Sequence, residues 1–240
     1  MTRRGALSYT YSIADLGHAI SLDILLWAPV LLFSVVAHER AHAIAAYRQG
    51  DDTAHLLGRT TWNPLKHLDP MMSAVVPLIL WYGSGGRFTF GAAKPVPVDP
   101  SKFRNYRRGD IIVSLAGIGV NLTILVACAA LYVLANLLGS AAPEVARLLQ
   151  RAFLLGMSLN LVLAFFNLIP VPPLDGSHVL FHLLPPELGL QYRRLARFGY
   201  LPIMALTFVP GVMNVLLWPA DQLMSLTGAL IGGFAVRGVS

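Results

Sequence analysis

Long apolar runs alternate with short polar connections along this chain. The apolar runs predict helices near residues 22–47, 111–138, 152–174 and 201–218, with a weaker one near 223–234. An apolar helix of about 20 residues is long enough to cross the hydrocarbon core of a bilayer. The pattern therefore predicts an all-α polytopic membrane protein with about five to six transmembrane helices.

The connection between the first two of these helices is long and rich in Gly, Pro, Thr and Lys. Its apolar stretch at 71–82 would reach only about 18 Å as a helix, against a core of about 30 Å. "RTTW" (59–62) and "RFTF" (87–90) mix β-branched and aromatic residues, which predicts two short strands. "KPVPV" (94–98) cannot be helical, because its prolines remove donors and favour extended backbone. We expect a re-entrant, partly β connection.

Composition supports the membrane assignment. Hydrophobic residues make up 55% of the chain and charged residues only 12%, against about 25% charged in soluble domains. No cleavage site follows Arg3 and Arg4, so we expect no removable signal peptide. The net charge of +6 suits anionic lipid headgroups, and we expect the bilayer as partner and no nucleic acid. The single cysteine, Cys128, excludes an internal disulfide and a cysteine zinc site.

The first apolar helix contains four ionisable residues in "HERAH" (38–42). His38 and His42 are spaced i, i+4, so both imidazoles lie on one helix face and can bind one metal ion. Glu39 flanks that position and can take a proton from the attacking water. A charge near the centre of a membrane helix costs about 2.5–3.5 kcal/mol, which favours a functional reason for these residues.

A catalytic zinc needs a third protein ligand. Asp175 is the best candidate, since it is the only acid between Glu144 and Glu187 and follows an apolar helix that is broken by prolines. An interrupted helix at membrane depth is tolerated where it lines a cavity. His178 is the second candidate for this ligand.

These motifs resemble those of the site-2 protease family of intramembrane zinc metalloproteases. "HERAH" is followed by "NPLKHLDP", "FGAAKPVPV" and "FNLIPVPPLDG", as in the compact bacterial members that lack PDZ or CBS domains. The likeness covers roughly residues 25–180. It implies that His38, His42 and Asp175 bind one Zn²⁺ and that Glu39 is the general base.

The resemblance also implies a substrate-binding set. Asn167 and Pro173 match the family's Asn-x-x-Pro…Leu-Asp-Gly motif, in which the Asn is associated with substrate handling. The middle helix keeps Asn121 of the family pattern Ala-Gly-Pro-x-x-Asn, but Ile118 replaces the proline. We therefore expect Asn167, Pro173 and Asn121 to bind substrate.

A shared zinc fixes part of the topology. His42 and Asp175 must lie at one depth in the second halves of their helices, so those helices run in the same direction and 71–82 does not cross. The HExxH helix then exits to a side with 12 Lys and Arg, against four on the other side. By the positive-inside rule the active site opens toward the cytoplasm, about 10 Å below the interface. We expect the bacterial cytoplasmic membrane.

These features predict hydrolysis of peptide bonds within or next to transmembrane segments of membrane-protein substrates, as in regulated intramembrane proteolysis. An unwound substrate strand can add to the extended segment 94–98. The alternatives are a non-proteolytic metal-binding membrane scaffold or zinc carrier, and an enzyme acting on a lipid amide. We expect a catalytic membrane core at 1–183 and further transmembrane helices of the same domain at 184–240. The substrate's identity and the oligomeric state stay open.

Overall fold

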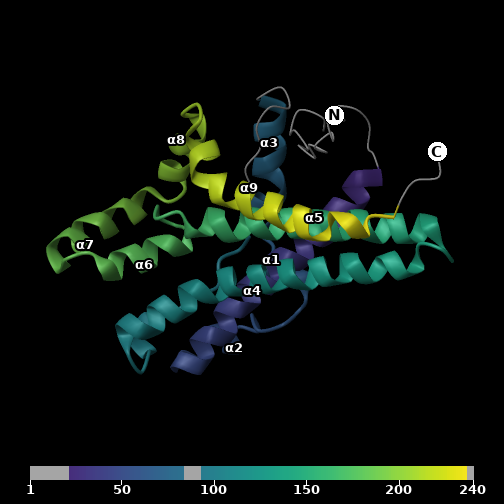
Figure 1. Cartoon of the computed structure of the whole chain (residues 1–240). Helices are drawn as coiled ribbons and strands as arrows, with labels where there is room; N and C mark the ends of the chain where they lie inside the picture. The colour runs from purple at the N-terminus through teal and green to yellow at the C-terminus, as the bar shows by residue number, and fades with distance from the viewer. Residues whose placement is uncertain (1–21, 84–92, 237–240) are drawn as a thin grey trace.

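Three long helices form the frame of the molecule. The computed structural model describes residues 22–83 and 93–236, and helix is the only regular structure in those ranges. Helices α4 (Tyr106–Ala135) and α5 (Pro143–Leu168) lie side by side, and α1 (Leu22–Gln49) crosses them (Figure 1). The chain runs in the same direction in α1 and α5 and in the opposite direction in α4. The expected all-α class is confirmed, and this arrangement agrees with the direction that a shared zinc requires.

Local sequence signals set the ends of α4 and α5. The Asn105 side chain caps α4 by accepting a hydrogen bond from the backbone N–H of Arg108. Pro143 occupies the first turn of α5, where its missing N–H costs nothing. The two helices and α9 (Val212–Ile231) enclose the largest buried apolar cluster, which contains Leu125, Tyr132, Met157, Leu161, Ala220 and Ile231.

Among the described residues, the structure contains fewer candidate membrane-spanning helices than the sequence predicts. Two segments of the described chain are long and apolar enough to cross a bilayer, Tyr106–Leu138 and Pro143–Leu168. A third is reached if Leu201–Thr207 and Val212–Phe234, which meet at a bend of 85°, count as one span. Helix α1 is not among these candidate spans. The five to six spans stay a prediction.

The connection after α1 contains short helical turns. These are α2 (Thr53–Leu56), a 3₁₀ turn (Pro64–Lys66) and a π turn (Met71–Val75) that continues into α3 (Val76–Gly83). In Figure 1, α3 stands across the direction of α4 and α5. The predicted re-entrant path of 71–82 stays a prediction.

The predicted strand at 59–62 is wrong. This segment forms a turn, because the buried Arg59 guanidinium donates to the backbone carbonyls of Lys66, Lys94 and Pro95 and folds the chain around them. The other predicted strand, 87–90, lies outside the described residues. The segment 94–98 is neither helix nor strand, which confirms that its prolines exclude a helix.

The C-terminal third departs most from expectation. The apolar run at 152–174 stops being helical at Leu168, and Asp175 begins a new helix, α6 (Asp175–Leu183), instead of ending the previous one. Helices α7 (Pro186–Arg193), α8 (Leu201–Phe208) and α9 (Val212–Ile231) follow. Gly211, at φ +79°, forms the bend that separates α8 from α9. The predicted helix at 201–218 is therefore broken, and 223–234 continues α9.

Candidate metal centre

Helix α1 brings two imidazoles to one point. His38 and His42 are both buried, and their Nε2 atoms lie 3.0 Å apart. The i, i+4 spacing puts both side chains on the face of α1 that packs against α4. The sequence prediction of a shared histidine face is therefore observed in the fold.

Asp175 reaches the same point from the first turn of α6. Its Oδ2 lies 3.3 Å from His38 Nε2 and 3.3 Å from His42 Nε2. A tight reversal of the chain after α5 places it there. In this reversal the backbone of Gly176 comes so close to α5 that a Cβ would lie only 2.1 Å from the Leu168 carbonyl oxygen. The glycine therefore allows α6 to start directly against the end of α5.

The outer nitrogen of each imidazole has a partner on α4. His42 Nδ1 donates to the Val113 carbonyl at 2.8 Å, so its Nε2 keeps a free lone pair. The Asn121 amide lies 3.1 Å from His38 Nδ1, and its carbonyl oxygen is buried without a partner. Exchanging the two ends of the amide lets this oxygen accept a hydrogen bond from His38 Nδ1–H. Both Nε2 atoms are then lone-pair donors, as metal ligands require.

The donor set fits zinc. Two imidazole lone pairs and one carboxylate oxygen converge, and Asp175 Oδ2 is buried without a hydrogen bond. Three acceptor atoms this close repel one another unless a cation lies between them. Tetrahedral ligands at about 2.0–2.1 Å from zinc stand roughly 3.3 Å apart, which matches the observed 3.0–3.3 Å. Among the described residues, this trio is the one group of histidines and acids arranged to hold a metal ion.

Gly117 on α4 leaves the space that the ligand atoms need. A Cβ at this position would lie 2.6 Å from the Nε2 atoms of both His38 and His42. The glycine therefore does more than permit close packing of the two helices. In contrast, a Cβ on Gly119 would meet nothing within 4 Å.

A cavity of about 390 Å³ opens beside the metal ligands. Glu39 lines it, next to His38 and His42, together with Asn167 and Pro173. Asn167 donates to the Leu163 carbonyl within α5. The extended segment forms another wall through Pro95, Val96 and Val98. The cavity therefore joins the predicted base, two of the predicted substrate-binding residues and the predicted substrate edge.

Asn121 does not line this cavity. Its side chain is completely buried and lies against His38. Its position suits a residue that orients the His38 imidazole better than one that contacts the substrate.

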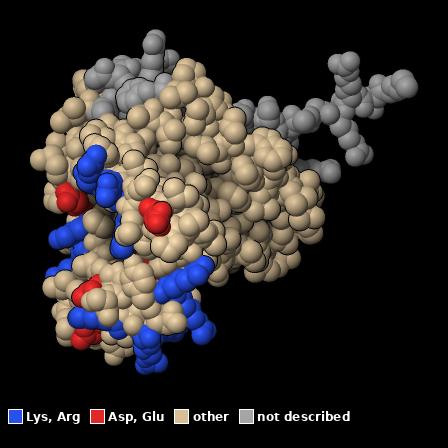
Figure 2. All heavy atoms as spheres, turned by 90° about the vertical axis from the view of Figure 1, so that its left-hand side faces the viewer, with Lys and Arg blue, Asp and Glu red and all other residues tan. Residues whose placement is uncertain are grey.

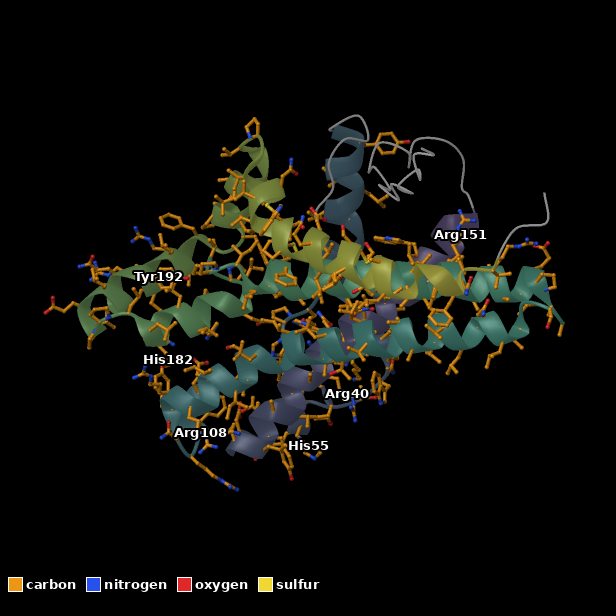
Figure 3. All side chains as sticks on the ribbon, in the orientation of Figure 1. Arg40, His55, Arg108, Arg151, His182 and Tyr192 are labelled. Atoms are coloured by element: carbon orange, nitrogen blue, oxygen red, sulfur yellow. The ribbon has the colours of Figure 1, made fainter. Side chains whose placement is uncertain are left out.

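The remaining candidates lie elsewhere. His178 does not join the trio but contacts Asp110, a buried acid of α4 that the sequence reasoning missed. A lone acid in an otherwise apolar helix was the signal that could have found it. His67 is fully buried, and its Nε2 lies 3.0 Å from the Thr61 carbonyl. Arg40 leaves the metal face, donates to the Thr60 carbonyl and packs over the Trp62 ring (Figure 3).

Comparison with known proteins agrees with this geometry. The profile of peptidase family M50 matches residues 27–206. "Putative zinc metalloprotease YwhC" of Bacillus subtilis is 36% identical over 206 residues, which are 83% of this chain and 90% of that protein. "Putative zinc metalloprotease Rip2" of Mycolicibacterium smegmatis is 31% identical over 75% of this chain and 66% of that protein. The Rip2 of Mycobacterium tuberculosis H37Rv is 32% identical over 75% and 65%. No solved structure matches this chain.

Proposed function

Because this chain belongs to peptidase family M50, the site-2 protease family, and is a zinc metalloprotease, we propose that it hydrolyses peptide bonds within or next to transmembrane segments of membrane proteins. The observation that carries the proposal is the convergence of His38, His42 and Asp175 beside Glu39 within a bundle of apolar helices. The proposal includes a place in regulated intramembrane proteolysis.

The site's geometry supports a role for each of these residues. His38, His42 and Asp175 would hold one Zn²⁺, which lowers the pKa of a bound water toward about 7 and polarises the scissile carbonyl. Glu39 takes a proton from the attacking water and delivers it to the leaving amine. Asn121 and the Val113 carbonyl hold the two imidazoles in the ligating tautomer.

The extended segment 94–98 is the proposed landing site for the substrate. A transmembrane helix must unwind before its peptide bonds are accessible, and its freed N–H and C=O groups then need partners. Val96 lies on the cavity wall between two prolines, and neighbouring described residues form no hydrogen bond with its backbone. Arg59 fixes the start of this segment through the carbonyls of Lys94 and Pro95. This arrangement suits β-addition of an unwound strand.

We propose that the site opens to the cytoplasmic face of a bacterial inner membrane. Figure 2 shows that Lys and Arg side chains gather at the end of the molecule that carries α2, α7 and the start of α4. This end holds Lys102, Arg104, Arg107, Arg108, Arg193, Arg194 and Arg197. The positive-inside rule places such an end in the cytoplasm.

The C-terminal helices belong to the same proposed domain as the catalytic core. Ile203 of α8 is fully buried against Ile169 and Leu174, which flank the break before Asp175. Ala220 and Ile231 of α9 pack into the cluster between α4 and α5. We therefore assign 1–183 to the catalytic core and 184–240 to helices that complete it.

A cleavage assay in liposomes tests the proposal. A panel of single-span substrates is incubated with wild type, Glu39→Gln and Asp175→Asn, and bound zinc is measured for each. We expect wild type to cleave, Glu39→Gln to keep its zinc but lose activity, and Asp175→Asn to lose both. If all three variants hold equal zinc and none cleaves, the chain acts as a metal-binding scaffold or zinc carrier.

A further inference from the structure

A second cluster of ionisable residues borders the same cavity. The Asp110 carboxylate on α4 accepts hydrogen bonds from two histidines of α6, His178 through Nδ1 at 3.2 Å and His182 through Nε2 at 2.8 Å. Asp110 is buried, and the His182 side chain is 5% exposed, whereas that of His178 is 46% exposed. His182 lies between α6 and the first turns of α4 (Figure 3). The two histidines therefore share one acid but differ in their access to the cavity.

Asp110 determines which nitrogen of His178 is free. A carboxylate only accepts hydrogen bonds, so His178 Nδ1 must carry the proton. Nε2 of the neutral ring then holds a lone pair and has no role in the contact with Asp110. Asp110 and His178 both line the cavity that contains Glu39 and Asp175. Asp110 therefore holds the His178 ring, and with it this lone pair, in a fixed orientation at that cavity.

His178 is also close to the reaction along the chain. It follows Asp175 by three residues on α6, so the two side chains share a helix face with their Cβ atoms about 5–6 Å apart. It does not join the metal trio. This histidine lies beside the metal ligands without being one of them, and a buried acid orients its ring. These are the features expected of a residue that contacts the substrate.

We propose that His178 Nε2 accepts a hydrogen bond from a backbone N–H of the unwound substrate strand. The proposal builds on the proposed protease function and adds a recognition residue to it. Unwinding frees substrate N–H groups that water cannot satisfy inside a bilayer. The extended segment 94–98 supplies backbone to the same cavity, but Pro95 and Pro97 in it lack N–H groups. His178 adds a side-chain acceptor, and Asp110 is its positioning residue.

A binding experiment tests this assignment apart from cleavage. Full-length, zinc-loaded Glu39→Gln in nanodiscs is titrated with the single-span peptides of the cleavage panel and with copies N-methylated at one backbone position each. N-methylation removes one N–H and leaves the side chains in place. We expect N-methylation at one position near the scissile bond to weaken binding about tenfold, which corresponds to the loss of one hydrogen bond.

The same titration with a second substitution locates the partner of that N–H. His178→Phe should weaken binding of the unmodified peptide by about five- to tenfold and abolish the extra loss at the sensitive position. His178→Gln, which keeps a side-chain acceptor, should restore binding to within about threefold of the His178 protein. The matched control is His182→Gln, which removes the other partner of Asp110 but lies away from the cavity wall. It should leave both the affinity and the sensitive position unchanged.

The outcomes separate this inference from the proposed function. Coupling between His178 and one substrate N–H supports the inference even if the wild type cleaves no panel member, a result that would count against the protease alone. The inference is overturned if wild type cleaves but N-methylation acts equally on both proteins. It is also overturned if His178→Phe loses zinc, or if no panel peptide binds.

Discussion

Two clusters in this protein share one composition and do different chemistry. Each pairs two histidines spaced i, i+4 on one helix with an aspartate from another helix: His38, His42 and Asp175 in one, and His178, His182 and Asp110 in the other. In the first, the imidazoles direct their protons outward and their lone pairs inward. In the second, both imidazoles direct a proton at the acid. The direction of the ring protons, more than residue type or spacing, separates a metal centre from a hydrogen-bonded anchor.

The outer contacts of the rings cause this difference. His42 Nδ1 is bound to the Val113 carbonyl, and His38 Nδ1 lies against the Asn121 amide, so each Nε2 is left for a cation. His178 Nδ1 and His182 Nε2 instead meet Asp110 directly, and no three ligand atoms converge there. Neighbouring groups that fix the tautomer are therefore as decisive as the ligands.

The largest effect should come from filling the space at Gly117. In Gly117→Ala, the new Cβ would lie 2.6 Å from two ligand nitrogens, so the imidazoles must separate. We expect a loss of zinc affinity of more than about a hundredfold and no cleavage. Zinc content and activity measure both.

Gly119→Ala is the control for this substitution. It adds the same methyl group to the same helix, where nothing lies within 4 Å, and should leave zinc and activity unchanged. Full zinc occupancy in Gly117→Ala would contradict the described approach of α4 to the imidazoles.

Next in size is the loss of a tautomer partner. Asn121→Ala removes the amide beside His38 Nδ1, so the ring can rotate or present a protonated Nε2 to the metal. We expect zinc affinity to fall by about 10- to 100-fold, measured by competition with a chelator. Unchanged affinity would show that helix packing alone orients His38.

Asp110→Asn should have the opposite effect, since it should lower the stability of the protein and leave zinc binding unchanged. It leaves the metal ligands in place but replaces a buried acceptor of two hydrogen bonds. We expect zinc stoichiometry to remain at one and the free energy of unfolding to fall by about 2 kcal/mol. Thermal unfolding of the zinc-loaded protein measures it. Loss of zinc at this position would mean that the two clusters act as one unit.

We expect the smallest effect from an exposed ion pair. It tests how far the effects expected at the two clusters depend on the burial of their charged groups. The Lys102 ammonium donates a 2.8 Å hydrogen bond to Asp52 and lowers the pKa of that carboxyl below its usual value of 3.8. Its contribution to stability is present above that value and disappears as the pH falls through the lower folded-state pKa. Lys102→Met should lower Tm slightly at neutral pH and not at about pH 2. A Tm difference that persists at low pH would exclude the ion pair as its cause.

The sequence was sufficient to predict the parts of the site that depend on the periodicity of a helix. The spacing within 38–42 fixes a shared face once the segment is helical, and Asp175 stands out as a lone acid in a proline-broken segment. The start of α6 at Asp175 was not predicted, because the apolar run 152–174 hides the point at which α5 ends. The partners Val113 and Asn121 are tertiary contacts that spacing does not reveal, although Asn121 was marked by resemblance.

The strand expected at 59–62 failed for a different reason. Its β-branched and aromatic residues favour extended backbone, but Arg59 is buried and needs acceptors for its guanidinium. Carbonyls at Lys66 and Lys94 supply them only if the chain turns. Burial of one cation therefore outweighed the local strand preference, a result that propensities of single residues do not contain.

One turn of α4 has a mechanical consequence. Val113 and Gly117 are four residues apart on one helix face, and the first offers its carbonyl to His42 while the second leaves room for the ligand nitrogens. Rotating or sliding α4 against α1 by one residue would withdraw the carbonyl and bring a side chain into the trio. The α1–α4 pair must therefore stay rigid through every turnover. Movement that admits a substrate and releases its fragments is then expected from chamber walls outside this pair, such as the segment 94–98.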